Sequence, residues 1–600
     1  MQVLIPAAGM GKRLGGATSD KTKCMIDLGE KTLIERCLDA VVLHPISRIV
    51  MIVGYEKDKL KEFLGNEYKG IEIIYVDNDD YATTNNIFSV FLAKEFLLED
   101  DTILIESDLV FEPNIIKMVI DNKFKNLAVV DKYRPWMDGT VVKIDNNFAI
   151  SHFIPKKDFN FDIADEYFKT VNIYKFSKEF LHDIYVPFLE AYSKALGDNE
   201  YYEQVLKVIV NLDTKELKAL PLNGQLWYEI DDIQDLDNAE ILFSNPEQKY
   251  ELISKRYGGY WRFDDFIDFC YLVNPYFPSE MMNNEIKYSL SKLMQSYPSG
   301  EKVQAMLASK MFDIPAETIV VGNGAAELIS LLTEELDIKL GLFGPTFEEY
   351  TARFSNIDLK ISEEQGYAYS QKDIINLANS NNNEGVILIN PDNPTGNYLP
   401  YNDIINILDD FKKSNKILIL DESFLDFADD GFNSSTLHTN ILNKYPQLIV
   451  IKSIGKSYGV GGLRLGVMAS SDTKLISKIK SKIPIWNINS VSEFYMQIIG
   501  KYKSEYIESC KKLSNARSEL YDALKSIDFI HPYKSQANYI FCKVDGIDSK
   551  KLAVDLCHRY SVLIKDCSDK TSINDNFIRV AVRDTKDNEY LVSCMKSLLD

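Results

Sequence analysis

The chain has 600 residues, of which 46% are hydrophobic and 26% are charged, a composition typical of a folded globular protein and not of a disordered one. At roughly 100–200 residues per domain, this length predicts several structural units. The formal net charge of −22 argues against a protein that coats nucleic acid, because such proteins carry a basic surface. No run of apolar residues reaches the roughly 20 that a membrane-spanning helix requires.

The eight cysteines include no C-x-x-C pair, and their spacing fits neither a zinc site nor a disulfide framework. Most of them lie within apolar runs, which indicates reduced residues of the core. We therefore expect a cytoplasmic protein without structural disulfides and with neither a nucleic-acid nor a membrane partner.

The first predicted strand, residues 3–5, runs directly into a glycine-rich segment at residues 7–16. Glycines at the end of a strand let backbone N–H groups approach an anion without obstruction by a Cβ atom. Lys12 and Arg13 lie within this segment and Lys23 follows it, so this acidic chain carries a local cluster of positive charge. The pattern favours a triphosphate-binding loop, and an ordinary strand-to-helix turn is the alternative at this point.

Short β-branched strands then alternate with helix-like segments, and the strands are expected at residues 49–53, 71–76 and 102–106. Such alternation predicts a mostly parallel sheet with helices on both faces. Asp108 follows the last of these strands, at the edge where open α/β sheets bind ligands. Glu229 and Asp231 are two residues apart in an extended segment and so face the same side. These three carboxylates could together hold one Mg²⁺.

The alternation fades midway along the chain and restarts in a second half. Strands of the second series are expected at residues 319–321, 340–343, 386–389, 417–420 and 448–451. We predict one domain at residues 1–245 and a second, also α/β, at residues 250–600. The second domain is expected to comprise a large lobe at about 275–500 and a small α+β lobe made of 250–274 and 501–600.

Residues 7–14 read Ala-Ala-Gly-Met-Gly-Lys-Arg-Leu, and further family-like segments lie at residues 81–89, 134–140 and 227–232. Through these segments, the first 243 residues resemble the nucleotidyltransferases that join a nucleoside triphosphate to a phosphorylated acceptor. Within that superfamily the resemblance is to the cytidylyltransferases that act on phosphocholine or 2-aminoethylphosphonate. It implies a Rossmann-like domain that uses CTP and Mg²⁺.

This resemblance also implies roles for individual residues of the first half. Nucleotide binding would fall to Ala7, Ala8, Gly9, Gly11, Lys12, Arg13, Lys23, Asn86 and Ser89. Mg²⁺ would be bound by Asp108, Glu229 and Asp231. Lys23 would contact the reacting phosphates, although Thr22 stands where the family has a proline. Trp136, with Asp138 nearby, would face the ammonium group of the acceptor.

Four pieces stand out in the second half: a Pro/Asn/Gly turn at residues 390–396, Asp421, Lys456 among small residues, and Arg464 eight residues later. The first three follow predicted strands, whose carboxyl ends meet at one edge of a parallel sheet. Pyridoxal phosphate needs such a set, because it takes a lysine for its Schiff base and a carboxylate beside its ring nitrogen. Order and spacing together predict a pyridoxal phosphate site.

Through these pieces and through Gly-Asn-Gly-Ala-Ala-Glu at residues 322–327, nearly all of residues 250–600 resemble the fold-type I aminotransferases. The resemblance implies that Lys456 forms the Schiff base, that Asp421 pairs with the ring nitrogen and that Arg579 binds the substrate α-carboxylate. Further cofactor contacts would come from Gly324, Ala325, Ala326, Phe347, Asn393, Ser453, Arg464 and Tyr297. Tyr297 is placed like a residue that reaches the cofactor phosphate of a neighbouring subunit, which implies a homodimer.

Within that superfamily, the second half is most similar to histidinol-phosphate aminotransferase and threonine-phosphate decarboxylase. The segments that lean toward the decarboxylase are residues 257–259, 268–275, 322–327, 421–427 and 486–490. Asn274, in the second of these, is assigned to the substrate. Phe424 stands where many aminotransferases have a tyrosine that bonds to the cofactor 3-hydroxyl. This departure disfavours ordinary transamination without excluding it, so decarboxylation and transamination both stay open.

Together the halves predict an enzyme of two consecutive steps. The second half would make a small phosphorylated or phosphonate amine, for example phosphoethanolamine from O-phosphoserine, and the first half would activate that amine with CTP. An alternative is a sugar-1-phosphate nucleotidyltransferase joined to a keto-sugar or histidinol-phosphate type of aminotransferase. A third hypothesis, that one half is an inactive binding module, is disfavoured because all the expected site residues are retained.

Overall fold

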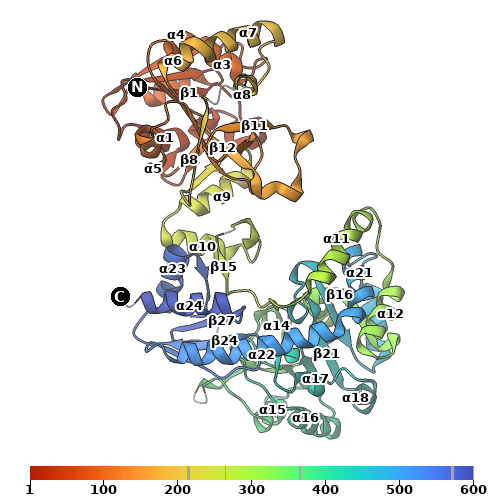
Figure 1. The fold of residues 1–600 in the computed structure, drawn as a ribbon. Helices are drawn as coiled ribbons and strands as arrows, with labels where there is room; N and C mark the ends of the chain where they lie inside the picture. The colour runs from red at the N-terminus through yellow and green to blue at the C-terminus, as the bar shows by residue number, and fades with distance from the viewer. Residues whose placement is uncertain are drawn as a thin grey trace. The chain divides into compact units, whose positions relative to one another are not determined.

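The computed structural model describes residues 1–212, 216–263, 265–363, 366–568, 570, 573 and 575–598 (Figure 1). The chain divides into two compact units, Met1–Tyr257 and Gly258–Asp600. Helix α10 (Pro246–Lys255) packs against α9 (Ile233–Phe243) of the first unit. The division therefore falls later in the chain than the boundary between residues 245 and 250 that the sequence suggests.

The first unit is built on a mixed ten-stranded sheet. Its order is β11 (Ile150–Ile154), β10 (Val141–Ile144), β12 (Phe168–Phe176), β7 (Thr102–Ile105), β1 (Gln2–Ala7), β4 (Ile49–Val53), β6 (Ile71–Asp77) and β5 (Glu67–Tyr68), with β9 (Leu127–Lys132) paired to β12 and to β13 (Lys218–Pro221). Strands β7, β1, β4 and β6 run parallel, as predicted, whereas β12 runs antiparallel to β7. The parallel strands end at one edge, which brings the glycine-rich segment after β1 close to Asp108 after β7.

Both faces of this sheet are covered by helices. The α-helices include α1 (Leu33–Val41), α2 (Lys57–Leu64), α3 (Asn86–Leu92), α4 (Lys94–Leu97), α5 (Asn114–Asp121), α6 (Lys178–Phe180), α7 (Val186–Leu196) and α8 (Glu203–Asn211). Successive side chains of β1 point to opposite faces, so Val3 and Ile5 join a core with α1, α2 and α5, and Leu4 joins another with α3, α7 and α8. A capping box between Thr32 and Glu35 begins α1.

A short antiparallel ribbon joins two distant segments of the first unit. In it, β8 (Leu109–Phe111) pairs with β14 (Trp227–Glu229), and Glu229 lies opposite Leu109. The Ile230 N–H donates to the Asp108 carbonyl oxygen at 3.1 Å. This pairing brings the carboxylates of Asp108, Glu229 and Asp231 to the same end of the sheet.

The second unit has a seven-stranded main sheet, which is parallel except for one strand. Its order is β16 (Ile319–Asn323), β22 (Leu465–Ala469), β21 (Leu448–Ser453), β20 (Ile417–Asp421), β19 (Gly385–Ile389), β17 (Leu340–Gly344) and β18 (Ile357–Ile361). Strand β22 is antiparallel to both of its neighbours. The segments that carry Phe347, Asn393 and Lys456 follow β17, β19 and β21, and Asp421 ends β20, so all four arise at one edge.

A second sheet of this unit contains β23 (Ile530–Pro532), β24 (Tyr539–Val544), β27 (Phe577–Ala581) and β26 (Lys565–Asp566), in that order and antiparallel. Strand β15 (Ile267–Asp268) pairs with β25 (Val562–Leu563), so the first residues of the unit lie with its C-terminal part.

The helices of the second unit vary widely in length. They include α11 (Glu280–Met294), α12 (Glu301–Phe312), α13 (Gly324–Thr333), α14 (Glu348–Arg353), α15 (Gln371–Ala378), α16 (Tyr401–Ser414), α17 (Gly431–Ser434), α18 (Thr439–Lys444), α19 (Ile454–Ser457), α20 (Thr473–Lys482), α21 (Ser490–Ile498), α22 (Lys503–Lys525), α23 (Ser549–Tyr560) and α24 (Thr585–Ser597). Among the described residues of both units, no helix is long and apolar enough to cross a lipid bilayer.

Candidate active sites

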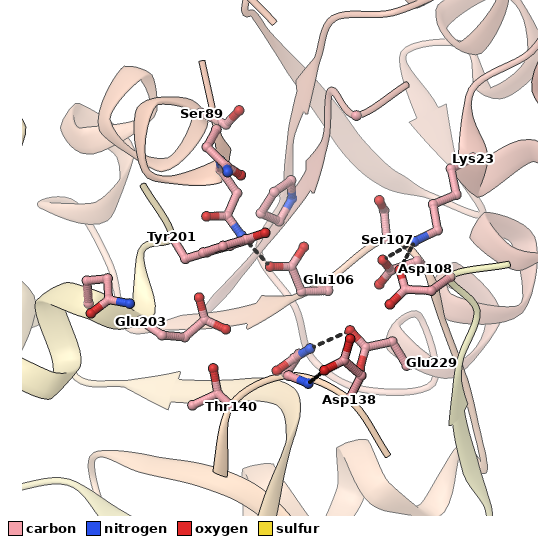
Figure 2. A pocket seen from close by; sticks show the side chains of 18 of the residues that line it. Lys23, Ser89, Glu106, Ser107, Asp108, Asp138, Thr140, Tyr201, Glu203 and Glu229 are labelled. Atoms are coloured by element: carbon pink, nitrogen blue, oxygen red, sulfur yellow. Dashed lines mark hydrogen bonds and ion pairs between the residues drawn. The ribbon is translucent and has the colours of Figure 1, made fainter. Parts of the chain in front are cut away.

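A cavity of about 860 Å³ opens at the end of β1 in the first unit (Figure 2). The glycine-rich loop forms one of its walls, and the start of α8 and residues 138–141 contribute others. Gly11 has a φ of 59°, and a Cβ atom there would lie 3.2 Å from Cβ of Lys23. The loop thus needs glycine at this position to pass close to Lys23.

Lys23 lies between two carboxylates of this cavity. Its Nζ is 2.6 Å from Oδ2 of Asp108 and 2.9 Å from Oδ1 of Asp231, and Arg13 contacts the same Asp231 oxygen at 2.9 Å. Burial alone would lower the pKa of Lys23, but the two carboxylates more than offset burial and raise it. For Asp231, burial is likewise outweighed by Lys23, so its pKa is lowered. Lys23 is therefore held in its charged form.

Glu229 has a different partner. Its Oε2 lies 3.1 Å from Nζ of Lys169, a fully buried lysine, and its Oε1 accepts from Nδ2 of Asn172 at 3.0 Å. Burial, to which the charges of Asp108 and Asp231 add, raises the pKa of Glu229 to about 7 even though Lys169 opposes the shift. Because Lys169 already neutralises it, Glu229 is a weaker candidate for a metal ligand than the sequence suggests.

The three predicted metal ligands do not form a closed site. Within the described ranges, no three Asp, Glu, His or Cys side chains converge as a metal-binding group. Asp108 nevertheless keeps one oxygen, Oδ1, buried and without a hydrogen-bond partner in the described structure. An all-oxygen set with an unused carboxylate oxygen fits the preference of Mg²⁺.

The residues expected near the nucleoside line the same cavity. Asn86, the first residue of α3, donates from Nδ2 to Oε1 of Glu106 at 3.2 Å and accepts from the Tyr202 N–H at 3.0 Å. Ser89 accepts a hydrogen bond from Nδ2 of Asn78 at 3.1 Å. Both side chains are thus held in fixed orientations at the cavity wall.

Trp136, which the sequence assigns to the acceptor, packs against another aromatic ring. Its ring stacks on that of Tyr228, with centroids 4.7 Å apart and planes 3° from parallel, and it packs against the core. It is not among the described residues that line the cavity, whereas the exposed Asp138 is. Stacking on Tyr228 covers one face of the Trp136 ring, so its sequence-based role toward an ammonium group stays a prediction.

In the second unit, Lys456 is a partly buried amine that lies over two aromatic rings. Its Nζ lies 4.2 Å from the ring centre of Phe424 and 5.0 Å from that of Phe347. Burial lowers the pKa of Lys456 to about 8; nearby Asp421 opposes this shift, whereas Arg579 and Arg464 add to it. A large fraction of this amine is therefore neutral near pH 8 and available as a nucleophile.

The carboxylate of Asp421 is held from two sides. The Tyr350 hydroxyl donates to its Oδ2 at 2.9 Å, and the Ser423 N–H donates to its Oδ1 at 2.9 Å. Tyr350 and Asp421 are both buried. These two hydrogen bonds fix the orientation of the Asp421 carboxylate at the edge of the sheet where Lys456 also lies.

Arg579 lies on β27 and is oriented by two contacts. Its Nη1 donates to Oδ1 of Asn393 at 2.7 Å, and its Nη2 donates to the Cys270 carbonyl at 2.6 Å. Its Nε is buried and has no partner in the part of the chain that the structure describes. The guanidinium therefore has donor capacity left for a carboxylate.

The start of α13 forms a cradle with Arg464. Gly324 has a φ of 77°, and a Cβ atom there would lie 2.8 Å from Nη2 of Arg464. No described side chain caps this helix, so its first N–H groups remain available. Such a helix start beside an arginine is suited to a phosphate group. Ser453 ends the neighbouring β21, where its N–H donates to Oγ of Ser423 at 2.9 Å.

Two further predicted residues, Tyr297 and Asn274, differ in their exposure to solvent. Tyr297 is 79% exposed and stacks on Trp486 with ring centroids 4.2 Å apart. Asn274 is buried, and its Nδ2 donates to the Ser457 carbonyl and to Oγ of Ser509, both at 3.0 Å. Asn274 therefore anchors the segment that carries Lys456, and its assignment to the substrate stays a prediction.

Comparison with known families agrees with this geometry. The family model for aminotransferase class I and II matches residues 266–594. The chain belongs to the aminotransferase class I and II family. A second model, for nucleotidyl transferase, matches residues 2–240. The aminotransferase-type domain thus follows a nucleotidyltransferase domain, and pyridoxal phosphate is the cofactor of the aminotransferase-type domain.

Individual relatives extend this result. CMP-5'-(3-aminopropyl)phosphonate synthase of Streptomyces rubellomurinus is 28% identical and covers 100% of this chain and 95% of its own. L-serine phosphate decarboxylase of Sulfurospirillum multivorans is 28% identical over 56% of this chain and 88% of its own. Among solved structures, a decarboxylase from Sulfurospirillum multivorans is 27% identical and covers 56% of this chain and 95% of its own with a TM-score of 0.51.

These findings confirm the predicted fold class and the prediction of an enzyme that joins a nucleotidyltransferase to an aminotransferase- or decarboxylase-type domain. The aminotransferase-type domain also has residues of interest that the sequence did not reveal. Tyr350 is three residues after Phe347, and no pattern indicates that it reaches Asp421.

The nucleotidyltransferase domain contains more of these unrecognised residues. Lys169 lies within β12, and Glu203 begins a helix far along the chain from Asp108. Glu106 could have been found, because it stands two residues before Asp108 at the same strand end.

Proposed function

We propose that the nucleotidyltransferase domain transfers the CMP group of CTP to a small phosphate or phosphonate that carries an amine. We propose also that the aminotransferase-type domain makes this amine by decarboxylating the corresponding phosphorylated or phosphono amino acid. One observation carries the proposal: both domains occur in this order along the full length of a match to a CMP-5'-(3-aminopropyl)phosphonate synthase. The similarity to an L-serine phosphate decarboxylase supports the second step.

In the nucleotidyltransferase domain, Mg²⁺ would be held by Asp108 and Asp231, with Glu229 as a further candidate. The glycine loop, Arg13 and Lys23 would hold the triphosphate through backbone N–H groups and positive charge. An oxygen of the acceptor phosphate or phosphonate then attacks the α-phosphorus, and the bond to the leaving pyrophosphate breaks. The protein contributes position and charge neutralisation to this step, and it forms no covalent bond itself.

In the aminotransferase-type domain, the described residues fit pyridoxal phosphate, because Gly324 leaves a cradle and the amine of Lys456 is partly buried and has no ion-pair partner among them. The remaining contacts would come from Ala325, Ala326, Phe347, Asn393, Asp421, Ser453 and Arg464. When bound, this cofactor supplies an electron sink for bond cleavage at the substrate Cα. Asp421 would keep a proton on the ring nitrogen, Arg579 would bind the substrate carboxylate, and the Lys456 amine would carry the proton to or from Cα.

Phe424 bears on the choice between decarboxylation and transamination. It is buried, its ring meets that of Tyr539 edge-on at 5.1 Å, and it has no hydroxyl to offer the cofactor. The absence of that donor favours a reaction other than ordinary amino transfer. Purified protein with pyridoxal phosphate and O-phosphoserine is expected to release CO₂ and phosphoethanolamine. Amino exchange that depends on a keto acid, without CO₂, would contradict the decarboxylase assignment.

The nucleotidyl transfer step is tested by pyrophosphate release. CTP is expected to support release with 2-aminoethylphosphonate or phosphoethanolamine, and sugar 1-phosphates are expected to be inactive. A preference for a sugar 1-phosphate would instead support the sugar-nucleotide alternative.

We also propose that the protein is a cytoplasmic homodimer formed through the second unit. Large apolar side chains on α11 and on the segments around Tyr297 and Trp486 are exposed, and exposed apolar side chains that gather in a patch are typical of interaction surfaces. They are Met281, Tyr288, Met294, Tyr297, Ile485 and Trp486. Light scattering is expected to give twice the mass of one chain, and Tyr288→Arg is expected to reduce it to that of the monomer.

A further inference from the structure

Two carboxylates of the nucleotide cavity have no part in the proposed transfer reaction. They belong to Glu106, which follows β7, and to Glu203, the first residue of α8. Figure 2 shows both side chains directed into the cavity. Glu203 is only 8% exposed, and its Oε2 is buried without a hydrogen-bond partner in the described part of the chain. Burying a carboxylate oxygen without a hydrogen-bond donor costs free energy, which indicates that a bound ligand supplies the missing donor.

Within the described ranges, these two side chains have no lysine or arginine in direct contact. Among the described residues, neither Glu106 nor Glu203 is in an ion pair, and the nearby Lys169 contacts Glu229 instead. Lys207, four residues along α8, lines the same cavity but forms no ion pair with Glu203 in the described structure. Burial raises the pKa of Glu203, although the charge of Lys169 opposes this shift. The two carboxylates therefore have no cationic partner among the described residues.

We propose that Glu203, with Glu106 beside it, binds the ammonium group of the acceptor, and that the acceptor is a primary amine. This inference rests on the proposed cytidylyl transfer and identifies its acceptor class. A primary ammonium has three N–H donors, which suit the unpartnered oxygen of Glu203. A quaternary ammonium cannot donate and is bound instead by aromatic faces. Trp136, the aromatic side chain expected for that role, is stacked on Tyr228 and does not line the cavity.

The test compares the full-length protein with its Glu203→Gln variant, which keeps the shape of the side chain and removes its charge. Pyrophosphate release is measured with CTP and three acceptors: 2-aminoethylphosphonate, phosphocholine, and ethylphosphonate, which has no amine. The wild type is expected to prefer 2-aminoethylphosphonate. The substitution is expected to raise the KM for 2-aminoethylphosphonate about 10- to 100-fold, because a hydrogen bond between charged groups contributes a binding free energy of that size. KM for CTP and activity with ethylphosphonate are expected to stay within about twofold.

Two more variants separate charge from shape. Glu203→Asp keeps the charge and is expected to retain part of the preference for the amine. Glu200→Gln makes the same chemical change three residues earlier, outside the cavity lining, and is expected to behave as the wild type. In addition, Glu203→Gln is expected to raise the melting temperature of the ligand-free protein, because it removes a buried, uncompensated carboxylate. A purely structural Glu203 would instead give a variant of lower melting temperature.

Calorimetric binding of 2-aminoethylphosphonate and ethylphosphonate separates this inference from the proposed function. If no acceptor supports pyrophosphate release but the amine still binds more tightly than ethylphosphonate, and only with Glu203 intact, the proposed transfer is wrong and the ammonium site stands. The site is refuted if Glu203→Gln weakens both ligands equally. It is refuted as well if the wild type prefers phosphocholine or does not discriminate between the two phosphonates.

Discussion

Both domains hold a partly buried lysine amine near carboxylates, yet the pKa of that amine moves in opposite directions. Lys23 contacts Asp108 and Asp231 directly, at 2.6 and 2.9 Å, and its pKa is raised. Lys456 contacts two aromatic rings instead, and burial lowers its pKa to about 8. Burial acts in the same direction at both lysines, so direct contact with carboxylates decides the outcome. Lys23 is thereby suited to hold phosphates and Lys456 to form and break bonds.

Removing Lys456 is expected to cause the largest loss of activity, and only the activity of the aminotransferase-type domain should be lost. Lys456→Ala should lower cofactor-dependent turnover by about 1,000-fold, because the acid–base group at Cα is lost. After borohydride reduction, mass spectrometry should find the cofactor attached to the wild type and not to the variant. Pyrophosphate release by the first domain should not change. A parallel loss of pyrophosphate release would mean that the two sites are not independent.

Removing Lys23 should affect both activity and stability. Lys23→Ala is expected to lower kcat/KM for pyrophosphate release about 100-fold, because a positioned charge at the transferring phosphoryl group is lost. It also leaves Asp108 facing Asp231. Their side chains are 18% and 23% exposed, so the free energy of unfolding should fall by about 2 kcal/mol, less than for a fully buried pair.

Addition of Mg²⁺ should restore part of this stability if Asp108 and Asp231 bind the metal as proposed. Lys31→Ala is the matched control, because Lys31 pairs with Asp39 at 2.6 Å on the surface, and it should cost less than about 1 kcal/mol. Chemical denaturation with and without Mg²⁺ measures these differences. Equal destabilisation by the two variants would show that Lys23 has no special electrostatic role.

The pH dependence of cofactor attachment tests the environment of Lys456. The neutral amine attacks the cofactor aldehyde, and it is the deprotonated form of a group whose pKa is lowered to about 8. The initial attachment rate should therefore rise between pH 7 and pH 9, with a midpoint near 8, whereas an ordinary lysine would require about pH 10.4.

Asp421→Asn should move this midpoint to lower pH, because Asp421 favours the charged amine. Asp522→Asn, a change of the same kind at an exposed position of α22, should leave the profile unchanged. Stopped-flow absorbance gives the rates. A midpoint that Asp421→Asn does not move would remove the electrostatic link between these two side chains.

Much of both sites was predictable because their residues follow strands. Parallel strands end at one edge, so Asp108, Asn393, Asp421 and Lys456 are found from the order of elements alone. Side chains that arrive from elsewhere in the fold were not predictable. Lys169 neutralises Glu229 from within an antiparallel strand, and this pairing depends on a register that no motif encodes. The stacking of Trp136 has the same origin, because its partner Tyr228 lies on a ribbon between distant segments.

Tyr350 is the least expected member of the second site, and its effect should be the smallest. Tyr350→Phe removes the buried hydroxyl that donates to Asp421 at 2.9 Å. The free energy of unfolding should fall by about 1 kcal/mol, as is usual when one buried hydrogen bond is lost. Turnover should fall about fivefold, and the absorbance of the bound cofactor should titrate at a different pH, because Asp421 is less firmly held. Tyr445→Phe removes a similar bond to Asp409 at the domain surface and should change stability without changing the titration. If both variants titrate as the wild type, Tyr350 supports the fold and has no part in orienting Asp421.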